Sequence, residues 1–248
     1  MWILGIDTCT ETMSVGLLGD NQEYEMRETA PKKQLIRLTQ MISEILDHHD
    51  LNISDISAIA ITRGPGSFTG TRLGIVTVKT LSQVMDIPLA PIQTLDALAS
   101  GVKYDGIVIP SMDARKNEVF FAVYEKKNDK FYRIGDYRKK HIDDYIKFVN
   151  ELDINSLPLQ NREIAEKPLL IAGSIFFRYE KRLDDELNVE FIKSPEESRT
   201  PHGLVIARMG KEMVSAGKTV DFLHLAPEYM RGADATPPTR MPGEKKKR

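Results

Sequence analysis

The sequence predicts a two-lobed α/β protein, because one order of elements, βββαβα, occurs twice along the chain. Apolar residues that alternate or run continuously mark the strands, and apolar residues at helical spacing mark the helices. The chain has 248 residues, 41% of them hydrophobic, which is enough for a core in each of two lobes. In each unit the first strands follow one another directly, whereas later strands are joined through helices. We therefore expect two mixed sheets flanked by helices.

The first unit occupies residues 1 to about 100 and forms the N-terminal lobe. Its expected strands are 2–7, 13–18, 22–29, 56–62 and 88–93. Its expected helices are 33–49, 70–85 and 94–100. A glycine-rich loop joins the strand at 56–62 to the helix at 70–85.

The second unit occupies residues 101–200 and repeats this order. Its expected strands are 107–112, 118–126, 130–139, 168–172 and 189–192, and its expected helices are 141–151 and 174–187. A polar connection fills 152–167. A last helix at 202–216, with Pro201 near its start and Gly217 near its end, is expected to join the N-terminal lobe. The remaining segment, 217–248, carries three prolines after Thr236 and a basic end, so we expect disorder from about residue 236.

The amino-acid composition argues against a nucleic-acid-binding, a membrane and a secreted protein. Lys and Arg total 34 and Asp and Glu total 36, so overall charge makes no case for nucleic-acid binding. No apolar run approaches the roughly 20 residues of a membrane span, and the N-terminus lacks a secretory signal. Cys9 is the only cysteine, which excludes an internal disulfide and a cysteine metal cage. These features predict a cytoplasmic protein that does not contact membranes.

The most informative segment runs from Ile59 to Ile75. An apolar run is followed by a loop with three glycines, and then a helical pattern opens; the loop residues are Gly64, Pro65, Gly66, Ser67, Phe68, Thr69 and Gly70. Glycines before a helix N-terminus can leave backbone N–H groups free for an anion. The loop matches neither the P-loop, since Thr71 and Arg72 follow the last glycine, nor the dinucleotide fingerprint. An anion site and a tight turn that packs a helix on a sheet both stay open.

Four segments in order resemble the TsaB (YeaZ) family. They are Gly64–Gly70, the opening Ile3-Leu-Gly-Ile-Asp-Thr8, the segment Met112-Asp-Ala-Arg-Lys-Asn-Glu-Val119, and Pro227-Glu-Tyr-Met-Arg231. The resemblance covers residues 1 to 232. It implies the actin/Hsp70/sugar-kinase fold of two RNase-H-like units. It further implies a non-catalytic partner of the tRNA threonylcarbamoyl transferase TsaD, which lets the ATPase TsaE and tRNA engage, and which forms a homodimer when TsaD is absent.

The phosphate loops of that superfamily are degenerate here. Active members carry an Asp-x-Gly turn after the first strand of each lobe, where the glycine lets backbone approach phosphate. The matching positions are Asp7-Thr8-Cys9 and Asp113-Ala114-Arg115, which keep both aspartates and neither glycine. We therefore expect no enzyme activity and no cofactor on the isolated chain, with ATP binding only at an interface in a complex. Two interpretations of the aspartates remain, as turn residues that hydrogen-bond local backbone or as metal ligands.

No other catalytic constellation replaces these loops. None of the five histidines has the i, i+4 spacing of a helical zinc pair. Cys9 follows an apolar strand, so we expect a buried thiol and not a nucleophile. The competing hypothesis is an enzyme of the same superfamily, either an ATP-dependent kinase or a metal-dependent peptidase.

The helix at 70–85 has more apolar residues than one core-facing stripe needs. One side carries Leu73, Val76, Thr77, Leu81 and Val84, and another carries Ile75, Val78 and Met85. The helix at 33–49 leaves Ile36 and Met41 off its core stripe. We expect Ile75, Val78, Met85, Ile36 and Met41, with the loop and Arg72, to form a partner surface. The alternative is complete burial within the chain.

Two charged segments each allow two interpretations. Arg72 lies in the first turn of its helix, where a cation is unfavourable, so we expect a specific acidic partner for it. Asp113–Glu118 is either a solvated turn or a polar site that faces the cleft and contacts a partner or tRNA. The basic cluster Lys245–Arg248 is either a solvated tail or a weak contact to RNA.

Overall fold

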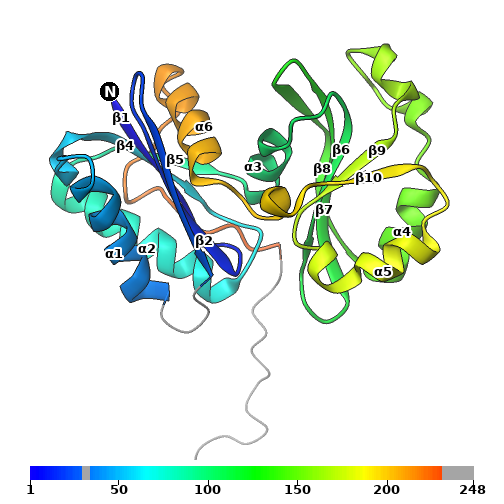
Figure 1. Cartoon of the computed structure of the whole chain (residues 1–248), viewed down its shortest axis with the longest axis horizontal. Helices are drawn as coiled ribbons and strands as arrows, with labels where there is room; N and C mark the ends of the chain where they lie inside the picture. Colours follow the sequence, from blue (N-terminus) through cyan, green and yellow to red (C-terminus); the bar gives the residue numbers. More distant parts are fainter. Residues whose placement is uncertain (30–33, 231–248) are drawn as a thin grey trace, which may run out of the picture.

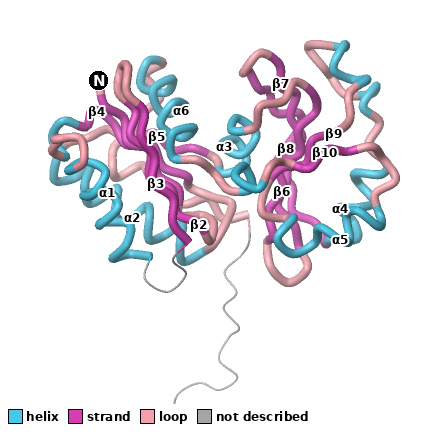
Figure 2. The backbone as a smooth tube through the Cα atoms, viewed as in Figure 1, coloured by secondary structure: helices cyan, strands magenta, loops and turns pink. Residues whose placement is uncertain are grey.

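The computed structural model describes residues 1–29 and 34–230, which form two lobes, each built on one five-stranded sheet (Figure 1). The tail from residue 236 and its basic cluster lie outside the described residues. Both sheets are mixed and carry helices on their faces (Figure 2). The predicted fold class is therefore confirmed.

The first sheet has the strand order β3-β2-β1-β4-β5. Its strands are β1 (Trp2–Asp7), β2 (Thr12–Leu18), β3 (Glu23–Thr29), β4 (Ile56–Thr62) and β5 (Leu89–Ile92). The central strand β1 pairs antiparallel with β2 and parallel with β4, which is the arrangement expected from direct and helical connections. Its helices are α1 (Gln34–Asp47), α2 (Phe68–Met85) and α3 (Thr94–Gly101), and a 3₁₀ turn, η1, spans Ile53–Asp55.

The second sheet repeats this plan in the order β10-β9-β6-β7-β8. Its strands are β6 (Gly106–Asp113), β7 (Glu118–Lys127), β8 (Lys130–His141), β9 (Leu169–Ala172) and β10 (Phe191–Lys193). Its helices are α4 (Ile142–Asn150) and α5 (Phe176–Glu186). The polar connection at 152–167 contains the 3₁₀ turns η2 (Ile154–Ser156) and η3 (Arg162–Glu166), and η4 spans Glu196–Arg199. The last helix, α6 (Gly203–Ser215), returns to the first lobe and packs on β1, β2 and β4.

Each lobe has its apolar core between the sheet and a pair of helices. In the first lobe α1 and α2 cover one face of the sheet and α6 covers the other (Figure 1). In the second lobe α4 and α5 cover one face, and α3 packs against the other. Among the helices within 1–29 and 34–230, none has the length and apolar character that a bilayer crossing demands.

Helix α2 starts at Phe68, two residues before the expected start. The Ser67 hydroxyl accepts a hydrogen bond of 3.2 Å from the backbone N–H of Gly70, which makes Ser67 the N-cap. The expected start was wrong because Gly70 suggested that the loop continued, although glycine is tolerated inside a helix at a cost.

Candidate functional site

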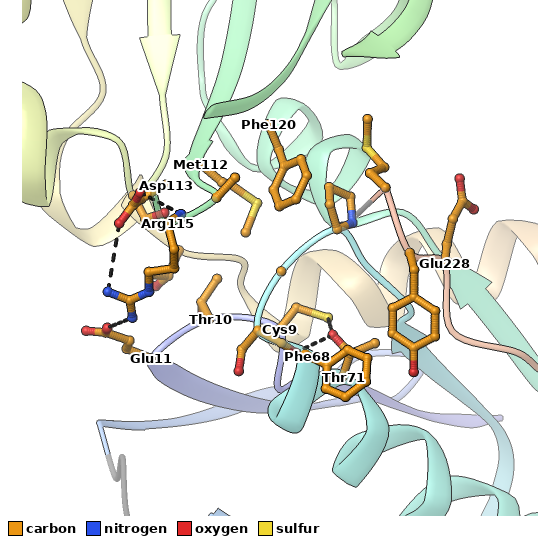
Figure 3. A pocket seen from close by; sticks show the side chains of 18 of the residues that line it. Cys9, Thr10, Glu11, Phe68, Thr71, Met112, Asp113, Arg115, Phe120 and Glu228 are labelled. Carbon is orange, nitrogen blue, oxygen red and sulfur yellow. Dashed lines mark hydrogen bonds and ion pairs between the residues drawn. The ribbon is translucent and has the colours of Figure 1, made fainter. Parts of the chain in front are cut away.

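A cleft of about 950 Å³ lies between the lobes, where the first strands of both sheets end (Figure 3). From the first lobe it is lined by Cys9, Thr10, Glu11, Pro65, Gly66, Ser67, Phe68, Thr71, Arg72, Glu228, Tyr229 and Met230. From the second lobe and its connection it is lined by Met112, Asp113, Ala114, Arg115, Phe120, Ser174, Phe177, Arg178 and Thr200. Cys9 of the first predicted phosphate loop, Asp113–Arg115 of the second and the glycine loop therefore meet at one cleft.

Asp7 is fully buried at the end of β1 and its carboxylate is already engaged. It accepts hydrogen bonds from the Thr62 hydroxyl at 2.6 Å, the Thr10 hydroxyl at 2.9 Å and the backbone N–H of Cys9 at 3.2 Å. Burial raises the pKa of Asp7 above its usual value despite these hydrogen bonds. Asp7 thus acts as a turn residue that holds the loop after β1. Among the described residues no group of three or more His, Cys, Asp or Glu side chains is arranged to hold a metal ion.

The start of α2 packs directly on the turn that follows Asp7. The Thr8 hydroxyl donates to the carbonyl oxygen of Gly70 at 2.8 Å. A Cβ atom added to Gly70 would lie 2.0 Å from the Thr8 carbonyl oxygen, and one added to Gly66 would lie 2.3 Å from the Cys9 carbonyl oxygen. Glycine is therefore needed for close approach of two backbone segments. This packing supports the tight-turn interpretation of the loop, and the residues around Asp7 do not fit a metal-bound nucleotide.

Within the glycine loop, burial changes along the chain. Gly64, Pro65 and Gly70 are buried, Gly66 is half-buried, and Ser67, Phe68 and Thr69 are exposed. The loop thus buries its two ends and exposes Ser67, Phe68 and Thr69, of which Ser67 and Phe68 line the cleft.

The turn after β6 is solvated at its tip and faces the cleft at its base. Arg115, Lys116 and Asn117 are exposed and have left-handed φ angles of 63°, 50° and 59°. Asp113 accepts a hydrogen bond of 2.9 Å from the Arg115 backbone N–H and pairs with the Arg178 guanidinium at 3.4 Å, while Ala114 is buried. The tip is therefore a solvated turn and the base faces the cleft, while a contact of this segment with a partner or tRNA stays a prediction.

The Cys9 thiol is buried, as the sequence predicted. Burial, together with the nearby Asp7 carboxylate, raises the pKa of Cys9 to about 11. Its sulfur lies 3.3 Å from the Thr71 hydroxyl and 3.5 Å from the Thr62 carbonyl oxygen. A thiol with this pKa is neutral at physiological pH and is a poor nucleophile.

Arg72 has aromatic partners where an acidic one was expected. Its guanidinium carbon lies 3.8 Å from the centre of the Phe68 ring, and its Nε donates to the Tyr229 hydroxyl at 2.6 Å. Within the described chain no carboxylate pairs with it. The expectation of an acidic partner inside this chain is therefore not met by the described residues, and the aromatic contact replaces it.

Three residues expected on the partner surface lie inside the first core instead. Ile75 is 3% exposed, and Val78 and Met41 are 0% exposed. Met85 is partly buried against the same core, whereas Ile36 is 60% exposed. The assignment of Ile75, Val78 and Met41 to free surface was wrong, because helical periodicity identifies two apolar stripes without showing which of them faces the sheet.

The surface that α1 and α2 expose is mostly uncharged, and its exposed charged residues are Asp47 at the end of α1 and Arg72 near the start of α2. We call the eight uncharged exposed residues between them the two-helix face. Its residues are Ile36, Thr39, Gln40 and Ser43 on α1 and Val76, Thr80, Gln83 and Val84 on α2. Val76 is 61% exposed and Val84 is 73% exposed. The charged Arg37 and Glu44 of α1 lie off this face, where Arg37 pairs with Glu44 at 2.6 Å and with Glu28 of β3 at 2.6 Å.

Several cleft residues were not singled out from the sequence. Phe120 comes from β7 of the second sheet, and Phe177 comes from α5. No local pattern marks them, since tertiary packing alone brings them together. Glu228 lay in a recognised motif, and it pairs with Arg63 at 2.7 Å, which holds the C-terminal segment on the first lobe.

Comparison with known proteins gives a family. The chain matches the family model described as "TsaD: tRNA N6-adenosine threonylcarbamoyltransferase" over residues 26–191. The Bacillus subtilis (strain 168) protein named "tRNA threonylcarbamoyladenosine biosynthesis protein TsaB" is 28% identical over 237 residues, which cover 95% of this chain and 96% of that protein. The Escherichia coli (strain K12) protein of the same name is 37% identical over 129 residues, which cover 51% of this chain and 56% of that protein.

Two solved structures from Pseudomonas aeruginosa share the fold. One is described as an uncharacterized protein with similarity to peptidase YEAZ, and it has a TM-score of 0.74 at 24% identity, covering 93% of this chain and 99% of that chain. The other, YeaZ, gives the same TM-score and identity over 92% of this chain and 99% of its own. At this identity the likeness concerns the fold alone.

Proposed function

Because this chain belongs to the TsaB (YeaZ) family, within the wider tRNA N6-adenosine threonylcarbamoyltransferase family, we propose that it is a non-catalytic scaffold in tRNA threonylcarbamoyladenosine biosynthesis. Its partner in this role is a TsaD-type transferase, which it binds as a heterodimer. The ATPase TsaE and tRNA then engage the complex and not the isolated chain. When the transferase is absent, the same surface pairs two copies of this chain.

The two-helix face is the observation that carries the proposal. Charged residues make up 28% of the chain, whereas the exposed charged residues of α1 and α2 are Asp47 at the end of α1 and Arg72 near the start of α2, and the eight exposed residues between them are uncharged. Depletion of charge with retention of apolar side chains is typical of the centre of a protein–protein interface. The ion pairs of Arg37 with Glu28 and Glu44 flank the face as a polar rim does.

The state of the first phosphate loop supports a non-catalytic role. The Asp7 carboxylate is buried, and both of its oxygens accept hydrogen bonds within the chain. Thr8 and Cys9 contact the start of α2 where an active ATPase would need open backbone. Any ATP in this system is therefore proposed to bind at an interface in the complex.

A binding experiment with the transferase tests the scaffold. The chain and the TsaD protein of the same organism are purified separately, and their affinity is measured by calorimetry. Val76→Lys combined with Val84→Lys should weaken binding strongly, because each lysine would place a charge in the dehydrated centre of the interface. The matched control is Ile192→Lys, which changes an apolar residue of β10 that is 40% exposed in the other lobe.

Two outcomes would count against this proposal. Wild-type affinity in the double variant would remove the two-helix face from the interface. Hydrolysis of ATP or of a peptide by the isolated chain would favour the enzyme hypothesis instead. The enzyme would then be a kinase or a metal-dependent peptidase.

A further inference from the structure

Helix α3 is the first connection between the lobes, and it belongs to the cores of both. It follows β5 of the first sheet, precedes β6 of the second, and contacts α6 on one side and β6, β7 and β8 on the other (Figure 1). Ala97 packs in an apolar cluster with Ala60 and Ile206 of the first lobe. Leu98 packs in the cluster that contains Phe120 of the second lobe. Rotation of one lobe against the other would have to break one of these contacts.

A buried lysine fixes the C-terminal end of α3 to the second sheet. Lys126 of β7 is 2% exposed, and its ammonium group donates to the carbonyl oxygens of Ser100 and Val102 at 2.5 Å each and of Ala99 at 3.2 Å. The last carbonyl groups of a helix lack partners in the helix and carry its negative dipole end. Here the Lys126 ammonium group supplies hydrogen-bond donors to these carbonyl groups and a positive charge at the negative end of the helix dipole. Lysine is almost never fully buried unless it is paired. The burial of Lys126 therefore depends on its contact with the end of α3.

Two tyrosines fix the middle of α3 to the same sheet. One oxygen of the Asp96 carboxylate accepts hydrogen bonds from the Tyr124 hydroxyl at 2.5 Å and from the Tyr137 hydroxyl at 2.8 Å. Tyr124 lies on β7 and Tyr137 on β8, so Asp96 is held by two strands. Hydrogen bonds to a charged carboxylate are about twice as strong as neutral ones.

The return connection, between β10 and α6, is held as well. Thr200, at the end of η4, accepts a hydrogen bond of 2.5 Å from the Arg27 guanidinium of β3. His202 lies 2.7 Å from the Glu25 carboxylate of the same strand. Across the cleft, the exposed side chains of Glu11 and Arg115 pair at 2.7 Å. Both crossings between the lobes are therefore fixed, and the cleft mouth is bridged.

We propose that these contacts lock the two lobes into one orientation, so that the chain works as a rigid body and its cleft does not close around a ligand. The lock is centred on α3, through Lys126 and the Asp96–Tyr124–Tyr137 cluster. Two-lobed proteins that close around ligands do so by hinge rotation of one lobe, and the buried contacts of α3 oppose such a rotation. The proposal rests on these contacts and not on the proposed scaffold role.

The distance between two spin labels, one in each lobe, tests the lock in the full chain. Because Cys9 is the only cysteine, Cys9→Ala gives a background without thiols. Asn21→Cys and Lys181→Cys place labels at exposed positions on the β2–β3 turn and on α5. Pulsed electron paramagnetic resonance should give one narrow distance distribution, unchanged by Mg²⁺ and ATP. Two populations, or a shift of the distance with ATP, would overturn the proposal.

Variants of the lock should broaden this distribution while the lobes stay folded. Lys126→Met keeps the volume and removes all three donors, and we expect at least a doubling of the width. The matched control is Lys127→Met on the same strand, since Lys127 pairs with Glu163 inside the second lobe. If circular dichroism shows that Lys126→Met is unfolded, the double variant Tyr124→Phe/Tyr137→Phe replaces it in this test. The double variant removes only the two hydroxyl groups that hold Asp96. A folded lock variant with the wild-type width would disprove the role of α3.

Discussion

The carbonyl oxygen of Cys9 accepts a hydrogen bond of 2.7 Å from the backbone N–H of Ser67. This bond joins the turn after β1 to the N-cap of α2. The two segments are far apart in sequence. The first matches a phosphate loop of active relatives of this fold, and the second was left open as an anion site or a tight turn. Here they meet one another. The packing that positions α2 and its two-helix face thus uses the backbone that phosphate binding would need.

Replacing Gly66 with Val should destabilise the protein and distort the start of α2. The added Cβ would lie 2.3 Å from the Cys9 carbonyl oxygen, and overpacking of this kind costs about 1–3 kcal/mol. Thermal unfolding measures this loss, and calorimetry with the transferase measures the effect on binding. Gly101→Ala is the control, since its Cβ would only reach Val205 at 3.6 Å. Equal melting temperatures for Gly66→Val and wild type would contradict this account of the loop.

Asp7→Asn should lower stability without changing ATP hydrolysis, which we expect to be absent in both proteins. The asparagine keeps one acceptor oxygen for three donors, so buried donors are left unsatisfied at a cost of about 1–3 kcal/mol. Chemical denaturation measures the loss of stability, and an assay of phosphate release measures ATP hydrolysis. Hydrolysis that survives purification and disappears in Asp7→Asn would show that the loop is catalytic after all.

The Cys9 thiol should resist alkylation in the folded protein at pH 7 to 8. Its pKa of about 11 leaves it protonated there, and its side chain is buried. Because the reactive thiolate forms only as the pH rises towards this pKa, labelling should accelerate at high pH and become complete in denaturant. Mass spectrometry after timed exposure to iodoacetamide gives the answer. Rapid labelling of the native chain at pH 7 would mean that the first turn opens.

Val78→Glu and Val76→Glu should have opposite effects, although the residues are two positions apart on α2. Val78 is 0% exposed, so its replacement buries an unpaired carboxylate and should unfold the first lobe. Val76 is 61% exposed, so its replacement should leave the melting temperature nearly unchanged and weaken self-association and transferase binding. Thermal unfolding and light scattering separate the two effects. Loss of association in a folded Val78→Glu variant would restore the original assignment of the partner surface.

Arg72→Ala should reduce partner affinity more than it reduces stability. Loss of the stack on Phe68 costs about 0.5–1 kcal/mol at an exposed site, while the cation has no carboxylate partner in the described chain and is free to meet one on a partner. Arg133→Ala is the matched control, because Arg133 stacks on Tyr137 at 3.9 Å in the second lobe. If both variants bind the transferase like the wild type, Arg72 and its loop lie outside the interface.

Local patterns in the sequence determined the element order. Alternating and helical spacing of apolar residues identified the strands and helices of both units, since these periods follow from backbone geometry alone. The loss of glycine from the turns after Asp7 and Asp113 could also be recognised in the sequence. The need for glycine in such a turn depends on local backbone conformation. Burial of Cys9 followed from its position after an apolar strand.

Tertiary structure alone decided which surfaces are free. Two apolar stripes were visible on α2, but the choice between Val78 and Val76 as the buried residue depends on where the sheet lies. The contact of Arg72 with Tyr229 joins residues 157 positions apart, and the three carbonyl contacts of Lys126 join residues 24 to 27 positions apart. Such contacts leave no periodic signal, because they arise only when the whole chain has folded and buried polar groups have found partners.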